Sequence, residues 1–183
     1  MDKSPKAWSS AASAARAHQP PAAASLAVDI LVEAGPWNCA NAIDAAIREA
    51  AQRAYDRSGR GGDGATQVVV VLSDDAAVQA LNRQFRGQDK PTNVLSFPAA
   101  DAVLGAPARS RHLGDIVLGY ETVLRECEEQ SVTLHDHVRH LVVHGVLHLM
   151  GFDHATDADA EQMEALEIRV LASLGVADPY SEL

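Results

Sequence analysis

Residues 144–154 read HGVLHLMGFDH, with histidines at His144, His148 and His154. Residues four apart in a helix share one face, so His144 and His148 can reach the same point. Gly151 can supply the left-handed turn that ends the helix, after which the chain can bring His154 back toward that point. Three imidazoles that converge in this way leave one coordination position open, as in catalytic rather than structural zinc sites. The segment therefore predicts a metal-dependent hydrolase that binds Zn²⁺, one ion per chain.

The spacing of these histidines also occurs in the zinc peptidases called metzincins, which need a glutamate directly after the first histidine as general base. Gly145 occupies that position here. Asp153 is the nearest carboxylate that could transfer protons instead, and it could equally orient a histidine ligand. A zinc-dependent peptidase or amide hydrolase is therefore a weakened alternative that stays open.

The helix predicted over residues 133–150 carries further histidines beside the first two of the motif. On a helical wheel, His137, His140, His144 and His148 share an arc of about 80°. His140 lies one turn from the metal and is predicted to orient a ligand or to face the substrate. His137 lies two turns away and is predicted to be a partly exposed helix residue.

A second segment, residues 81–98, reads LNRQFRGQDKPTNVLSFP and leads from a helix end through a polar loop into a strand. Pro91 favours an extended approach to the strand, and Thr92 and Asn93 can fix a turn through bonds to the backbone. Arg86 has two interpretations. A cation at a helix C-terminus stabilises the helix dipole, and a planar guanidinium also binds phosphate oxygens well.

Together with Leu113-Gly114-Asp115-Ile116, the two segments closely resemble the YbeY family of bacterial endoribonucleases, also called rRNA maturation factors. The resemblance covers about residues 26–175. It implies that the zinc ligands are His144, His148 and His154, and that Arg86 is important for catalysis. Gln88 departs from the lysine often found at its position, which removes one expected phosphate contact.

The resemblance further implies metal-dependent cleavage of single-stranded RNA in ribosomal RNA processing, notably at the 3′ end of the small-subunit rRNA, and in ribosome quality control. The expected partners are ribosomal RNA precursors, the small ribosomal subunit and its assembly factors, with no membrane involved. A second alternative lies outside the enzymes. It is a ribosome-assembly factor that binds RNA without cutting it and uses the metal to hold its fold.

The charge of the chain is unevenly distributed. The net charge is −10, which argues against a protein that wraps nucleic acid by bulk attraction. Residues 83–111 nevertheless carry five basic and two acidic side chains, whereas residues 112–183 have a net charge of −11. Lys90 and Arg83 in the basic segment are candidate RNA contacts, although a solvated loop fits the same pattern. Any RNA affinity should be modest and sensitive to salt.

A chain of 183 residues is expected to form one domain. Residues 1–25 are rich in Ala, Ser and Pro and predict a disordered extension; the metallohydrolase domain is expected over 26–175 and a tail over 176–183. No apolar run approaches the roughly 18–20 residues that span a bilayer. With only Cys39 and Cys127, a disulfide framework is not expected, and the cytoplasm is the predicted location.

The predicted fold class is α+β, with a small mixed four-stranded sheet covered by helices and the metal site on a helix of the C-terminal half. Ser73 and Thr133 are the expected N-caps of two helices. The helix over residues 157–174 is expected to cover the sheet rather than to bind RNA. Strands are predicted near residues 26–32, 68–72, 94–97 and 115–118, and helices over 38–55, 73–85, 120–130, 133–150 and 157–174.

Overall fold

The computed structural model describes residues 25–37, 43–61, 64–99 and 110–181. Every helix and strand predicted from the sequence is present, and the predicted N-terminal extension falls outside the described residues except for residue 25. The elements are β1 (Leu26–Val32), α1 (Ile43–Arg57), β2 (Ala65–Ser73), α2 (Asp75–Arg86), β3 (Val94–Pro98), β4 (Ser110–Gly119), α3 (Tyr120–Gln130), α4 (Leu134–Leu149) and α5 (Asp157–Ser173).

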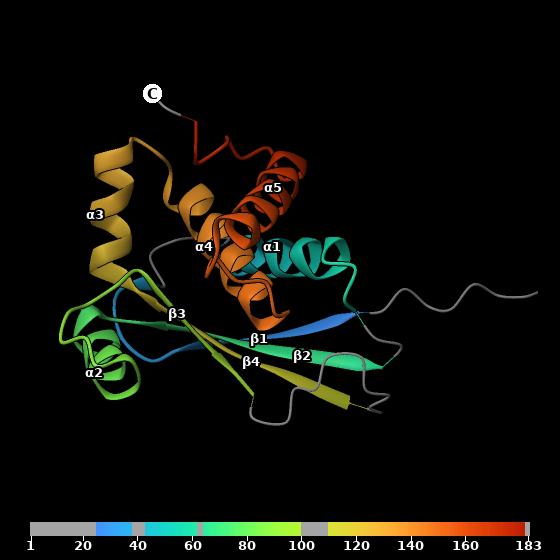
Figure 1. Ribbon diagram of the computed structural model, residues 1–183. Helices are drawn as coiled ribbons and strands as arrows, with labels where there is room; N and C mark the ends of the chain where they lie inside the picture. The colour runs from blue at the N-terminus through green and yellow to red at the C-terminus, as the bar shows by residue number, and fades with distance from the viewer. Residues whose placement is uncertain (1–24, 38–42, 62–63, 100–109, 182–183) are drawn as a thin grey trace, which may run out of the picture.

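The described strands form one mixed sheet in the order β1-β2-β4-β3. The pairs β1–β2 and β2–β4 are parallel, whereas β3 runs antiparallel to β4 at the edge of the sheet. Helices α1 and α4 lie over one face of the sheet and α5 packs on them from outside (Figure 1). Helix α2 contacts β3 and β4 through a separate, smaller apolar cluster that includes Val78, Leu95 and Val117. The predicted α+β fold is confirmed.

Two strands are longer than predicted. The apolar run in β2 covers only residues 68–72, but its backbone pairs from Ala65 to Ser73. β4 begins at Ser110, five residues before the predicted start. The added residues are partly polar, with Thr66 beside Arg111 in the register. Backbone hydrogen bonding in a central strand does not depend on side-chain polarity, so an apolar run underestimates the length of such a strand.

The predicted cap of α2 is wrong by one residue. Ser73 is the last residue of β2, and its carbonyl oxygen accepts a 2.9 Å hydrogen bond from the indole nitrogen of Trp37. Asp74 is the N-cap instead, because its side chain accepts a hydrogen bond from the backbone nitrogen of Ala77. The cap predicted for α4 is confirmed, since the Thr133 side chain accepts from the backbone nitrogen of Asp136.

The structure also bears on the expectations about disulfides and membrane-spanning helices. Cys127 on α3 is a buried free thiol, and Cys39 lies outside the described residues. Of the helices within the described ranges, none combines the length and the apolar character needed to cross a bilayer. Helix α1 begins at Ile43, with residues 38–42 of its predicted span outside the description, and it continues to Arg57.

Helix α4 approaches the sheet closely at Gly145. A Cβ atom placed there would lie 2.9 Å from Cδ1 and 3.1 Å from Cγ2 of Ile116 on β4, and 3.1 Å from Oγ of Ser96 on β3. Carbon atoms in ordinary van der Waals contact stay about 3.5–4.0 Å apart. A side chain at this position would therefore require Ile116 and Ser96 to shift, which disfavours the glutamate that a metzincin would carry there.

Gly145→Ala is predicted to destabilise the fold even though alanine favours helices. The added methyl group must displace Ile116 or lift α4 from the sheet, and overpacking of this kind costs about 1–3 kcal/mol. The free energy of unfolding in urea measures the effect. In the double variant with Ile116→Val, which removes the methyl group nearest to the new Cβ, the loss should be smaller than the sum of the two single losses. Equal or greater stability of Gly145→Ala would contradict the close approach.

Candidate metal centre and its pocket

The three histidines of the motif meet at one point. His144 and His148 project from the last turns of α4, and His154 follows in the turn that leaves the helix. One ring nitrogen from each residue lies within 4.8 Å of the corresponding nitrogens of the other two. His144 and His148 are half-buried and His154 is exposed, so the cluster opens toward solvent on one side.

The turn after α4 brings His154 to this point. Gly151 has a φ angle of +79°, in the left-handed region predicted for it. The backbone nitrogen of Phe152 donates to the carbonyl of Leu147, and that of Gly151 donates to the carbonyl of His148. These two bonds define a Schellman motif, which satisfies the last carbonyls of the helix and reverses the chain direction. The reversal allows three residues close in sequence to face one another.

Hydrogen bonding selects the tautomer of His148. Its Nδ1 lies 3.1 Å from the carbonyl oxygen of Phe152, and a carbonyl only accepts, so Nδ1 carries the proton. The Nε2 atom therefore presents a lone pair, and it lies 3.0 Å from Nε2 of His144. Burial lowers the pKa of His148, and the neighbouring His144 and His154 lower it further. A neutral imidazole is the form that binds metals.

Glu167 of α5 contacts His140 and His144 from behind the cluster. Sequence reasoning missed it, because it assigned α5 only a covering role. Its side chain is 0% exposed. Its Oε1 lies 3.1 Å from Nε2 of His140 and 3.4 Å from Nδ1 of His144, and neither contact has the angles of a hydrogen bond. Burial alone would raise the pKa of Glu167, but its contacts with His140 and His144 outweigh burial and bring the pKa to about 2. The buried carboxylate is therefore ionised and faces the histidines.

A signal for Glu167 was present in the sequence. The buried residues of α5 recur at helical spacing, and a carboxylate stands within that apolar stripe. A charged residue at such a position is almost never fully buried unless it is paired, so it predicts partners on the facing helix. The stripe consists of Met163, Leu166, Glu167, Val170 and Leu171.

The remaining histidines of α4 lie behind the cluster. His140 contacts Glu167 and does not line the pocket, which agrees with an orienting position rather than with one that faces substrate. The prediction that His137 is partly exposed is wrong, since it is only 4% exposed. Its Nε2 lies 2.7 Å from the Glu126 carboxylate of α3, a helix whose packing against α4 a helical wheel cannot reveal.

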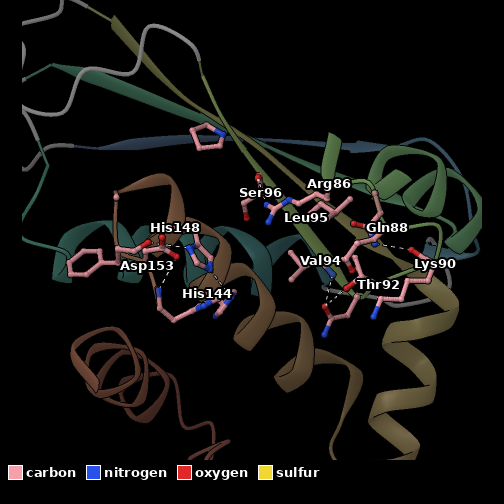
Figure 2. A pocket seen from close by; sticks show the side chains of 16 residues that line it. Arg86, Gln88, Lys90, Thr92, Val94, Leu95, Ser96, His144, His148 and Asp153 are labelled. Atoms are coloured by element: carbon pink, nitrogen blue, oxygen red, sulfur yellow. Dashed lines mark hydrogen bonds between the residues drawn. The ribbon is translucent and has the colours of Figure 1, made fainter. Parts of the chain in front are cut away.

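A pocket of about 660 Å³ joins the histidine cluster to the loop between α2 and β3 (Figure 2). Arg86 reaches into it from the end of α2, where its Nη2 donates a 3.3 Å hydrogen bond to the Ser96 carbonyl of β3. Both interpretations of Arg86 agree with this position, because it ends the helix and lines the pocket. Lys90 also lines the pocket, whereas Arg83 does not and lies 3.9 Å from the exposed Asp89 carboxylate.

Buried hydrogen bonds hold the pocket wall in place. Asn82 donates from its side-chain amide to the carbonyl of Lys90 at 2.8 Å. The Asn93 amide donates to the carboxylate of Glu126 at 2.9 Å, and its oxygen accepts from the backbone nitrogen of Val94. Of the side-chain bonds to backbone predicted for Thr92 and Asn93, the one from Asn93 is present, whereas the Thr92 hydroxyl bonds to the Asn93 side chain. The loop that carries Lys90 is thus tied to α2 and α3.

The residues present suit a bound metal ion. Three imidazoles with one ring nitrogen each at a common point form a donor set typical of zinc, and the Glu167 carboxylate behind His144 is a partner of the kind that orients such ligands. Asp153, next to His154, accepts a 2.8 Å hydrogen bond from the His154 backbone nitrogen and also lines the pocket. It is the one carboxylate among the described residues of the lining.

Comparison with known proteins gives one consistent family. Residues 37–175 match the family described as "Endoribonuclease YbeY". A protein of that name from Parvibaculum lavamentivorans is 46% identical over 161 residues, which cover 85% of each chain. Another, from Chelativorans sp., is 45% identical over 84% of this chain and 93% of its own. A third, from Paramagnetospirillum magneticum, is 54% identical over 66% of this chain and 74% of its own.

The link between Glu126 and His137 predicts a pH dependence of stability. Burial raises the pKa of Glu126, but hydrogen bonds from His137 and Asn93 lower it more, so the folded value lies below the ordinary 4.5. A carboxylate with a depressed pKa stabilises the fold above the pKa of the unfolded chain, and this stabilisation is lost as pH falls through the folded value. Glu126→Gln should therefore be less stable than wild type at pH 7, and the difference should shrink below pH 4.5.

Urea unfolding of both proteins between pH 7 and pH 3 measures this difference. Glu128→Gln serves as the matched control, because Glu128 is exposed on the same helix. The control should follow wild type at every pH. A constant difference in the free energy of unfolding between Glu126→Gln and wild type across the range would show that the ionised Glu126 carboxylate does not account for the added stability.

Proposed function

The chain belongs to the YbeY endoribonuclease family, and on that premise we propose that it is a zinc-dependent endoribonuclease specific for single-stranded RNA. Its substrates are ribosomal RNA precursors in the cytoplasm, with the 3′ end of the small-subunit rRNA as the main site. We propose that it binds the small ribosomal subunit and its assembly factors, and that it also acts in ribosome quality control.

One observation carries the proposal: Arg86 and the three histidines line the same pocket. The two groups come from different helices, since Arg86 is the last residue of α2 and His144 and His148 lie in the last turns of α4 (Figure 2). A planar guanidinium can bind two oxygens of a phosphate in a bidentate manner. A metal ion can bind a further phosphate oxygen or a water molecule. A phosphodiester between them would contact both groups.

The residues of the pocket have separate roles in this proposal. His144, His148 and His154 hold the zinc ion, which supplies Lewis acidity and lowers the pKa of a bound water to about 7. Arg86 binds the scissile phosphate and stabilises the negative charge that builds up on its oxygens. Lys90 contributes a further positive charge along the RNA backbone, and Asp153 transfers protons at the metal side.

The two alternatives meet specific obstacles. A metzincin-type peptidase needs a glutamate at position 145, where a Cβ atom alone would come within 2.9 Å of Ile116. A binding factor without catalysis would not need an open metal site beside an arginine, although it remains an outcome of the experiment. Arg83 is the weaker of the two predicted RNA contacts, because its side chain points away from the pocket lining toward Asp89.

Arg86→Ala is predicted to lower the rate of single-stranded RNA cleavage by about 100- to 1,000-fold, as removal of one transition-state donor does in other hydrolytic enzymes. Zinc content should not change, because Arg86 contacts Ser96 rather than the histidines. Arg83→Ala is the matched control, three residues earlier on the same helix, and its rate should stay within about threefold of wild type, as expected for an exposed charge.

Cleavage of a labelled single-stranded RNA, followed on gels at saturating and subsaturating substrate, measures these rates. Products that end in a 2′,3′-cyclic phosphate would identify the RNA's own hydroxyl as the attacking group. Full activity of Arg86→Ala would refute the role assigned to the arginine. If zinc-loaded wild type binds ribosomes but cuts no RNA, the non-catalytic alternative replaces the proposed function.

A further inference from the structure

We propose that Glu167 positions His144 as a metal ligand and that Tyr180, in the segment after α5, holds Glu167 in place for that purpose. The inference rests on the metal centre of the proposed function but not on its RNA substrate. We refer to Glu167 and Tyr180 together as the carboxylate clamp. It lies behind the histidines, and neither of its residues lines the pocket.

The two carboxylate oxygens of Glu167 have different partners. The Tyr180 hydroxyl donates a 2.6 Å hydrogen bond to Oε2. With Oε2 held there, Oε1 is directed at the imidazoles of α4, 3.4 Å from Nδ1 of His144 and 3.1 Å from Nε2 of His140. The Tyr180 ring also contacts the His140 ring edge to face, with 6.3 Å between centroids. The tyrosine therefore holds one oxygen of the carboxylate and packs against one of the imidazoles that the other oxygen faces.

A carboxylate at Nδ1 suits the chemistry of a histidine ligand. His144 presents its Nε2 to the cluster, 3.0 Å from Nε2 of His148, so a metal-binding tautomer must keep its proton on Nδ1. Oε1 of Glu167 is buried beside Nδ1 without a hydrogen-bond partner, so a proton on Nδ1 would supply its donor, and the carboxylate favours that tautomer. His148 receives the same support from the carbonyl of Phe152.

A purely structural role does not require a carboxylic acid at position 167. A glutamine would fill nearly the same volume, and its amide oxygen would also accept the hydrogen bond of Tyr180, more weakly than a carboxylate does. Burying a carboxylate costs free energy unless cations or donors face it, so the charge requires partners beyond the tyrosine. The imidazoles of His140 and His144 are the partners that the structure provides.

The position of Tyr180 is itself well defined. Its backbone nitrogen donates to the side chain of Asp178 at 2.9 Å, and the Ser181 hydroxyl donates to the Asp178 carbonyl at 2.8 Å. Burial raises the pKa of the Tyr180 hydroxyl, and the bond to Glu167 raises it further, so the group remains a donor. The match to the family ends at residue 175, so this part of the clamp comes from the segment that the sequence assigns only to a C-terminal tail.

The test is metal affinity of the full-length chain, measured by competition with a coloured chelator. Tyr180→Phe removes only the hydroxyl, and the dissociation constant for Zn²⁺ should rise about three- to tenfold. Glu167→Gln removes the charge at Nδ1 and should raise it about ten- to a hundredfold, the range seen for partners of zinc ligands. The visible absorption of Co²⁺-substituted protein should change in both variants, because ligand orientation sets its band positions and intensities.

Tyr55→Phe is the matched control. It removes another tyrosine hydroxyl that makes a buried 3.0 Å hydrogen bond, to Thr66 on β2 and not to the histidines. The control should keep wild-type zinc affinity and the wild-type Co²⁺ spectrum, whatever its melting temperature. Melting of the metal-free proteins separates loss of stability from loss of affinity.

Two results would overturn the proposal. If Glu167→Gln binds Zn²⁺ as tightly as wild type, the carboxylate does not position the ligand. If Tyr180→Phe lowers only the melting temperature, with affinity and spectrum unchanged, the tyrosine serves stability alone. RNA cleavage by zinc-loaded wild type is assayed separately. Absence of cleavage there would refute the proposed RNA substrate and leave the clamp standing.

Discussion

The close approach of α4 to the sheet at Gly145 determines where the rest of the site lies. Because no side chain separates the helix from Ile116 and Ser96, the last turns of α4 rest directly above β3 and β4. His144 and His148 flank this contact and therefore face the loop that enters β3, where Arg86 is bonded to Ser96. A larger residue at position 145 would have to displace Ile116 and Ser96 or lift α4 from the sheet. This packing therefore places the last turns of α4 opposite Arg86 and disfavours the glutamate of a peptidase at position 145.

The charges around the site are arranged in two layers. The pocket presents Arg86 and Lys90 toward the space between the loop and the histidines, in a chain whose net charge is −10. The carboxylate of Glu167 lies behind the histidines, out of contact with solvent. In the proposed function, an anionic substrate would meet Arg86 and Lys90 in the pocket, while the buried carboxylate of Glu167 stays out of its reach. This separation is compatible with phosphodiester binding by an acidic protein.

Patterns within one short segment predicted the features that depend only on the backbone geometry of that segment. The spacing of His144, His148 and His154 with Gly151 predicted the convergence, because helix periodicity and a left-handed turn leave few alternatives. The roles of Glu167, Tyr180 and His137 depend on contacts between different elements, and a wheel drawn for one helix carries no information about its neighbours. The shift of the α2 cap from Ser73 to Asp74 has the same origin, since strand pairing extends β2 by one residue.

Metal-dependent RNA cleavage is the central claim, and removal and return of the metal tests it most directly. Purified protein is incubated with a single-stranded RNA and with a duplex of the same sequence, before and after chelation and again after Zn²⁺ is restored. We predict that the single strand alone is cut, that chelation abolishes cutting, and that Zn²⁺ restores it. Cleavage that persists undiminished after complete removal of the metal would contradict the account.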